Sequence, residues 1–286
     1  MNRFPRPRRG LIAAVIAVLL VGGIGWLYLA GPLAHPPPGC TVTLTEGPAG
    51  DSAANGSTDN SAGVLAYSMT PEQADNAATI AGVGSRLGMP AHAVTVAIAT
   101  ALQESGLHNL AGGDRDSKGL FQQRPSQGWG TAAQLADPVY AATAFYQRLR
   151  QQPNWMVLEV TQAAQLVQHS AAPRAYAQWE PQARATAAAL TGENDASLSC
   201  HDLNLGPPEF GLVSVAKREL GTATLSGPQP PDRGRALANW LVAHSVRLAV
   251  DRVTLNGDTW TADSGRWTRT GPPDGLLGLH QLGDPA

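Results

Sequence analysis

A single carboxylate closes one of the most apolar segments of the chain. In the stretch ALQESGL, residues 101–107, Glu104 stands two residues after the end of AHAVTVAIATAL, in which most residues are small or apolar. A helix without a polar face is usually buried on most sides, and the negative end of the helix dipole lies at its carboxyl end. Both conditions favour the protonated form of an acid. We therefore expect Glu104 to donate a proton to a leaving-group oxygen, which is the chemistry of glycosidic cleavage.

Two further acids follow in the polar loop GGDRDSKG, residues 112–119. If Asp114 or Asp116 reaches the site of Glu104, it could position a water molecule, and the enzyme would be an inverting hydrolase. The alternative is a solvated turn in which the aspartates cap backbone groups. The charges and glycines of the loop favour this second interpretation.

The pair Glu104-Ser105, followed fifteen residues later by GLFQQ at 119–123, resembles two signatures of the soluble lytic transglycosylases, Glu-Ser and Gly-Leu-Met-Gln. These enzymes are relatives of the goose-type lysozymes. LADPVYAATAFYQRL at 135–149 is similar to the family's Asp-Pro and the helix that packs behind its site. The likeness covers roughly residues 70–192 and is strongest over 98–124.

This resemblance implies a lysozyme-like fold in which Glu104 is the only acid and base. The expected substrate is the β-1,4 bond between N-acetylmuramic acid and N-acetylglucosamine in peptidoglycan glycan strands. The family uses the sugar's own 6-hydroxyl to form a 1,6-anhydro product, and it needs no metal or organic cofactor. We therefore expect no cofactor here.

The chain departs from the family where Ala-Tyr-Asn-Ala-Gly is typical, because it has LVQHSAAP at 166–173. The Tyr-Asn pair that helps to hold substrate is missing, and Gln168, Ser170 and Tyr176 are the candidate substitutes. Two other residues have structural alternatives: Gln122 could satisfy the backbone of a buried turn, and Trp129 could be a core residue instead of stacking on a sugar ring. The full set of expected substrate-binding residues is Ser105, Gly119, Leu120, Phe121, Gln122, Gln123, Trp129, Gln168 and Tyr176.

The elements that would position these residues are mostly helices. TPEQ, beginning at Thr70, is typical of a capped helix start, and Gly106 and Gly192 are typical of helix ends. Periodic apolar residues predict helices over 71–87, 91–105, 137–151, 160–170 and 174–190. Residues 70–195 are thus predicted to form a mainly α, lysozyme-like catalytic domain.

The last part of the chain, residues 206–286, has a different texture. SVAKREL and GRALANWLVAHSVRLA predict helices, and DRVTLNGDTWTADSGRWTRT predicts strands paired through a turn at Asn256-Gly257. We expect a small α+β accessory domain. It faintly resembles the final third of zinc-dependent cell-wall carboxypeptidases, but Ala238 stands where a zinc ligand is expected and His280 alone remains of a histidine cluster. We therefore expect no metal site.

The start of the chain predicts that the domains after it lie outside the cytoplasm. RFPRPRR precedes an uncharged apolar run from Gly10 to Ala30, which at 1.5 Å per residue would span roughly 30 Å of bilayer core. We expect a cytoplasmic basic tail at 1–10, a transmembrane helix at 11–30 and a stalk rich in Pro, Gly and Ser at 31–69. The alternative is a cleaved signal peptide and secretion.

Two cysteines in an oxidising compartment are expected to pair, so we predict a disulfide between Cys40 and Cys200. Two free thiols are the alternative. The formal net charge of −2 argues against nucleic acid as a partner. Two functions remain: a membrane-anchored peptidoglycan glycosidase, and a glycan-binding scaffold of an envelope or secretion assembly that has lost turnover. The intact Glu104 favours the first, and the missing Tyr-Asn pair favours the second.

Overall fold

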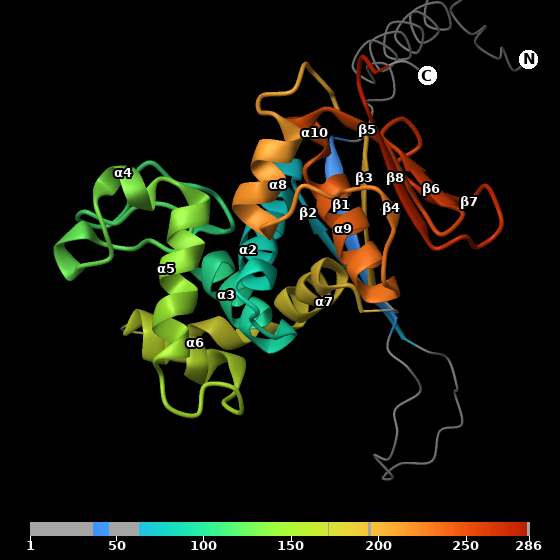
Figure 1. Cartoon of the computed structure of the whole chain (residues 1–286). Helices are drawn as coiled ribbons and strands as arrows, with labels where there is room; N and C mark the ends of the chain where they lie inside the picture. The colour runs from blue at the N-terminus through green and yellow to red at the C-terminus, as the bar shows by residue number, and fades with distance from the viewer. Residues whose placement is uncertain (1–36, 46–62, 171, 194–195, 285–286) are drawn as a thin grey trace, which may run out of the picture. The chain divides into compact units, whose positions relative to one another are not determined.

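Helices and two antiparallel sheets alternate along the chain (Figure 1). The structure, a computed structural model, describes residues 37–45, 63–170, 172–193 and 196–284. The first part contains β1 (Gly39–Thr45), β2 (Val64–Met69), α2 (Pro71–Arg86), α3 (Ala91–Ser105), η1 (Pro125–Gln127), α4 (Ala132–Leu135), α5 (Pro138–Arg150), α6 (Val160–Gln168), η2 (Ala175–Trp179) and α7 (Glu180–Thr191). The rest contains β3 (Ala196–His201), α8 (Leu212–Leu220), β4 (Gly227–Pro228), α9 (Pro231–Ala243), α10 (Ser245–Leu248), β5 (Val250–Leu255), β6 (Asp258–Thr261), β7 (Trp267–Arg269) and β8 (Leu276–Gln281).

The prediction of a mainly α fold was wrong, because the described residues form an α+β structure with two antiparallel sheets. In the first sheet β1 lies between β2 and β3. Both β1 and β2 fall within 31–69, the expected stalk. That range is rich in Pro, Gly and Ser, so its composition does not indicate a strand. In β1, however, Cys40, Val42 and Leu44 are buried and alternate with more exposed residues. A strand of period two needs only a few apolar residues to cover a core.

The predicted basic tail at 1–10 and transmembrane helix at 11–30 lie outside the described residues. Within the described ranges, no helix is long and apolar enough to cross a membrane.

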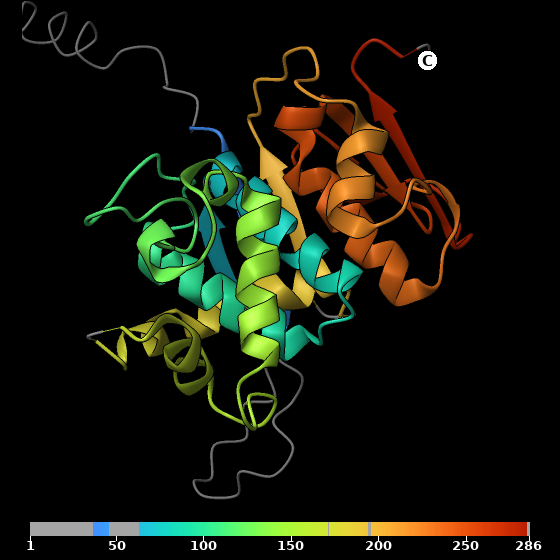
Figure 2. The ribbon, with the colours of Figure 1, turned by 60° about the vertical axis from the view of Figure 1, so that its left-hand side comes forward.

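The predicted helix boundaries of the first half are largely confirmed. Thr70 caps α2 through a reciprocal pair of hydrogen bonds with Gln73, and α3 ends at Gly106, whose φ of 63° is left-handed. Most of α3 is buried, because it packs against α2, α5, α6 and α7. Figures 1 and 2 show α2 between α5 on one side and the C-terminal helices α8 and α9 on the other.

The C-terminal part contains the predicted helices and hairpin. Asn256 and Gly257, with φ of 51° and 82°, connect β5 to β6, as the preference of this dipeptide for the hairpin turn leads one to expect. The second sheet has the order β4-β8-β5-β6-β7. α8 and α9 pack against α2, and α9 also packs against α7, so the described residues from Pro38 onward form one compact unit.

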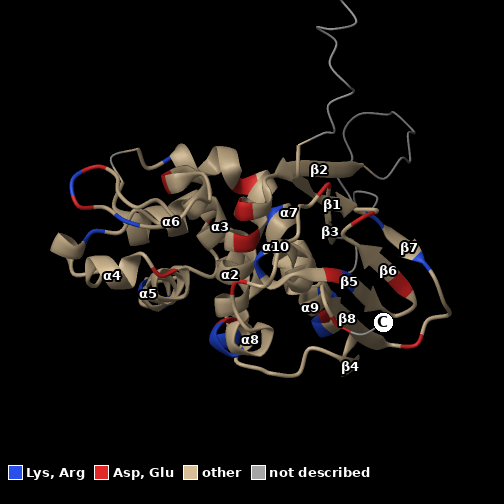
Figure 3. Ribbon diagram, turned by 90° about the horizontal axis from the view of Figure 1, so that it is seen from above, with Lys and Arg blue, Asp and Glu red and all other residues tan. Residues whose placement is uncertain are grey.

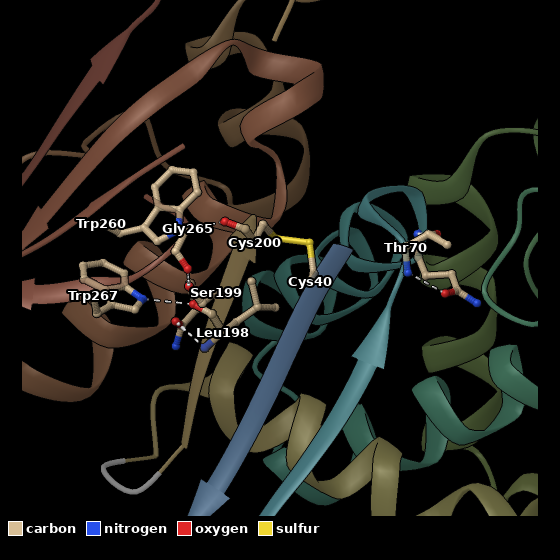
Figure 4. The surroundings of a disulfide bond; sticks show 10 residues. Cys40, Thr70, Leu198, Ser199, Cys200, Trp260, Gly265 and Trp267 are labelled. Carbon is tan, nitrogen blue, oxygen red and sulfur yellow. Dashed lines mark hydrogen bonds between the residues drawn. A yellow bond between two sulfur atoms is a disulfide. The ribbon is translucent and has the colours of Figure 1, made fainter. Parts of the chain in front are cut away.

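The predicted disulfide between Cys40 and Cys200 is confirmed. It joins β1 to β3, whose residues 40 and 200 are register partners (Figure 4). The other edge of β3 contacts residues 206–286, which we call the C-terminal tail. Trp260 Nε1 donates to the Cys200 carbonyl at 3.2 Å, and Trp267 Nε1 donates to the Leu198 carbonyl at 3.0 Å. These two tryptophans therefore connect the C-terminal sheet to the strand that carries the disulfide.

Candidate functional site

Glu104 is the second-last residue of α3 and is partly buried. Its Oε1 accepts a hydrogen bond from the hydroxyl of Tyr176 at 2.8 Å. Tyr176 lies on η2 and is fully buried. Burial raises the pKa of the Tyr176 phenol, and the neighbouring charge of Glu104 raises it further. The phenol therefore remains a neutral donor that fixes one oxygen of the Glu104 side chain.

The GLFQQ turn lies against the end of α3, next to Glu104. Ser105 Oγ is 2.7 Å from the carbonyl oxygen of Leu120, to which it donates, and 3.0 Å from that of Ala101. From the other side, Gln168 Nε2 donates to the carbonyl of Phe121 at 2.9 Å. The structure thus brings together six of the residues singled out from the sequence, although they are far apart along the chain: Glu104, Ser105, Leu120, Phe121, Gln168 and Tyr176.

The remaining residues of the turn are occupied by contacts within the protein. Gln122 has a φ of 46°, and its side-chain amide donates to the Gly119 carbonyl at 3.0 Å and accepts from Ser117 Oγ at 3.0 Å. Gln123 is buried and donates to the Ala141 carbonyl on α5 at 3.2 Å. Gly119 has a φ of 73°, and a Cβ there would lie 2.2 Å from the Leu135 carbonyl oxygen. These residues give the turn its shape.

The apolar members of the expected set are core residues. Leu120 and Phe121 are completely buried, and the Phe121 ring stacks on Phe145 of α5 with centroids 4.7 Å apart. Trp129 is 6% exposed, and the guanidinium carbon of Arg148 lies 3.5 Å from its ring centroid. One face of this indole is therefore covered by a cation, which corresponds to the structural alternative considered for Trp129.

Both aspartates of the 112–119 loop hold the loop together. Asp114 pairs with Arg124 at 2.6 Å. Asp116 accepts from the backbone N–H of Ser126 at 2.8 Å and from its hydroxyl at 3.0 Å. The Ser126 backbone and hydroxyl hydrogen bonds lower the pKa of Asp116. Asp116 thus has the capping role considered from the sequence, and Asp114 forms an ion pair. The hydrogen-bond partner of Glu104 is instead the phenol of Tyr176.

Sequence reasoning missed the residue beside Glu104. The side-chain oxygen of Gln103 accepts from Trp179 Nε1 at 2.9 Å and from Gln178 Nε2 at 3.0 Å. Both donors belong to the η2 segment that carries Tyr176. Gln103 therefore fixes η2 on α3, and with it the position of the phenol. The signal was present, because Gln103 is a second polar residue at the end of an otherwise apolar helix.

Four cavities in the described part of the chain are lined by other residues, and the largest of these four, about 500 Å³, lies among α2, α3, α7, α8 and α9. Glu104 thus faces the surface from a helix end and does not line these cavities. The described residues also contain no group of three His, Cys, Asp or Glu side chains that could hold a metal ion.

A buried cluster of charged residues was also missed. His244 is completely buried between Asp75 and Glu219, to which its two ring nitrogens bond, and Arg247 binds Asp75 at 2.8 Å and Glu219 at 2.9 Å. Figure 3 shows acidic and basic positions side by side on α2, α8 and α10. We call Asp75, Glu219, His244 and Arg247 the charge cluster.

The charge cluster is electrically balanced. Burial alone would raise the pKa of Glu219, but the charges and hydrogen bonds of His244 and Arg247 lower it to about 2. Burial alone would lower the pKa of His244, but the charges and hydrogen bonds of Glu219 and Asp75 raise it. Two anions thus face two cations, as a buried set of charges requires. This cluster fastens α2 to the C-terminal helices.

No family model matches this sequence, and a search of curated proteins finds no match to it.

Proposed function

We propose that the protein cleaves peptidoglycan glycan strands, with Glu104 as the single acid and base. The observation that carries the proposal is the Glu104–Tyr176 hydrogen bond at the end of an apolar helix, with the GLFQQ turn held beside it by Ser105 and Gln168. The carboxylate is accessible, and its hydrogen-bond donor is a neutral phenol. The disulfide supports action in an oxidising compartment outside the cytoplasm.

The proposed reaction has two proton transfers at Glu104. The protonated carboxyl first gives its proton to the glycosidic oxygen as the bond from that oxygen to C1 of the N-acetylmuramic acid breaks. The carboxylate then takes the proton of the 6-hydroxyl, whose oxygen bonds to C1 of the same sugar. The products are a new hydroxyl on one fragment and a 1,6-anhydro end on the other, and no water is consumed.

Tyr176 assists the first half of this cycle, in which Glu104 gives up its proton. After the first proton transfer Glu104 is an anion, and the hydrogen bond from the phenol stabilises it. Tyr176 was one of the candidate substitutes for the missing Tyr-Asn pair. Its hydroxyl contacts the acid itself, so in this proposal it acts on Glu104 and not on the substrate. The arrangement favours the sugar hydroxyl as nucleophile, since Asp114 and Asp116 are held by Arg124 and Ser126.

The full chain should be incubated with purified sacculi in water enriched in ¹⁸O, and the masses of the released muropeptides measured by mass spectrometry. We expect anhydro ends without ¹⁸O. Glu104→Gln should lower release by about 10²- to 10⁴-fold, the usual contribution of acid–base catalysis. The matched control Glu193→Gln, an exposed acid after α7, should be fully active.

The second candidate, a glycan-binding scaffold, predicts a different result. The departure from the family at 166–173 is the observation that favours it. In that case neither the native chain nor Glu104→Gln would release fragments, and both would sediment with sacculi to the same extent. Release of ¹⁸O-labelled reducing ends would instead show hydrolysis and would refute the proposed nucleophile.

A further inference from the structure

A second ligand site is indicated at the cavity of about 500 Å³ among five helices, which Glu104 does not line. This volume lies in the range of small-molecule pockets. Its apolar surface comes from residues that are themselves largely buried: Met89, Leu190, Leu237 and Trp240. Such a surface suits a ligand with an apolar body.

Two arginines line the same cavity, Arg86 at the end of α2 and Arg233 in the first turn of α9. Among its described lining residues there is no Asp or Glu. The acids next in sequence are engaged elsewhere, because Asp232 pairs with Arg235 and Glu219 belongs to the charge cluster. Arg86 donates to a hydroxyl, that of Thr143, at 3.1 Å.

The helix ends do not cancel the charge of these arginines. α2, α7 and α8 end at the cavity, whereas α3 and α9 begin there. With roughly half a charge at each end, negative at the carboxyl ends and positive at the amino ends, the five termini sum to roughly −0.5. The two guanidinium groups contribute +2, so the cavity has an excess of positive charge.

We infer that this cavity binds a small amphipathic anion, a carboxylate or phosphate monoester attached to a compact apolar group. The oxyanion would bind Arg86 and Arg233, whose planar donors suit both anions. The apolar group would contact Leu237 and Trp240. Because α2 and α7 precede the tail and α8 and α9 belong to it, such a ligand would bridge the two parts of the chain. This site is independent of the proposed cleavage of glycan.

The indole N–H of Trp240 provides a reporter, since Trp240 lines the cavity. The full chain, labelled with ¹⁵N at tryptophan, would be titrated with N-acetyl-L-leucine, with isopentyl phosphate and with the neutral N-acetyl-L-leucinamide. We expect a saturable shift of the Trp240 signal with the two anions and none with the amide. The tighter of the two anions identifies the source of the oxyanion.

The double variant Arg86→Gln/Arg233→Gln should bind the better anion at least tenfold more weakly. Arg184→Gln, an exposed arginine on α7 outside this cavity, is the matched control and should bind normally. Ala236→Phe, which places a ring in the cavity, should also abolish the shift. The inference is overturned if neither anion shifts Trp240, if the amide binds as tightly as its acid, or if the double variant keeps its affinity.

Discussion

Glu104 and Glu219 occupy the same local position in two different helices. Each is the second-last residue of its helix, and each helix ends at a left-handed glycine, Gly106 or Gly221. Their partners differ. Glu219 is 2% exposed and bonds to Thr79, Trp240, His244 and Arg247. Glu104 is partly exposed and accepts one hydrogen bond, from Tyr176.

The difference shows that the neighbouring charges, and not the position at a helix end, decide whether a carboxylate can change its protonation without disturbing the fold. Glu219 faces two cations that hold it ionised, so a change in its protonation would cost the charge cluster its balance. The hydrogen-bond donor of Glu104 is neutral, so its carboxyl group can lose and regain a proton without leaving a cation uncompensated. Glu219 is therefore a structural residue of the charge cluster, whereas Glu104 is the acid that the proposed mechanism uses.

The strongest test of this comparison replaces each acid by its amide. Glu219→Gln leaves His244 and Arg247 with an uncompensated charge in a buried place, so the free energy of unfolding should fall by about 3–5 kcal/mol. Glu104→Gln should change it by less than about 1 kcal/mol, because the group is partly exposed. Urea denaturation followed by circular dichroism measures both. Equal midpoints for the two variants would remove the distinction.

Acid should act through Glu219 in the native protein. Its pKa is lowered from 4.5 to about 2, so its stabilising effect is complete above the unfolded value and is lost as the pH falls from 4.5 toward 2. This shift corresponds to about 3 kcal/mol. Denaturant titrations at several pH values should show this loss in the native chain and not in Glu219→Gln. Parallel acid curves would contradict the assignment.

Base should act through His244 in the opposite direction. Its pKa is raised above 6.5, so the stabilising effect of the imidazolium is complete below that value and is lost as the pH rises through the folded pKa. The native chain should therefore lose stability on the alkaline side, whereas His244→Gln should not show this pH dependence. A native chain whose unfolding midpoint is constant through this range would indicate a neutral imidazole.

A smaller effect is expected from the partner of Glu104. Tyr176→Phe removes the donor to the carboxylate, and a hydrogen bond to a charged group contributes about 1.5–3 kcal/mol. Muropeptide release should therefore fall by about tenfold to a hundredfold, with little change in KM, because the bond acts on the reacting acid. Phe145→Leu, a matched loss of an aromatic ring that stacks on Phe121, should alter stability more than turnover. Unchanged release by Tyr176→Phe would remove the phenol from the mechanism.

The parts of the fold that were predictable are encoded by neighbours in sequence. Thr70 with Gln73, the glycine after α3, and Asn256-Gly257 each act within a single turn. The first sheet needed pairing between β1 and β3, whose cysteines are 160 residues apart. The predicted disulfide joined these two segments, but no local period showed that they are paired strands, and the short apolar alternation of β1 lies in a polar range.

The same division holds for the functional residues. The spacing of Glu104-Ser105 and GLFQQ led to residues that do lie together, and Gln168 and Tyr176 came from a short segment farther on. The sequence left open whether Gln122 and Trp129 bind substrate or serve the fold, and their contacts correspond to the structural roles. The charge cluster could not be found, because Asp75, Glu219 and His244 meet only when the tail packs on α2.

The most direct measurement is muropeptide release from sacculi by the native protein, Glu104→Gln and Glu219→Gln, expressed per folded molecule. The assay is run under conditions in which circular dichroism shows all three proteins to be folded. We predict that Glu104→Gln is as stable as the native chain and releases almost nothing, whereas Glu219→Gln is less stable and releases fragments at the native rate. Release by Glu104→Gln at the native rate would contradict the account.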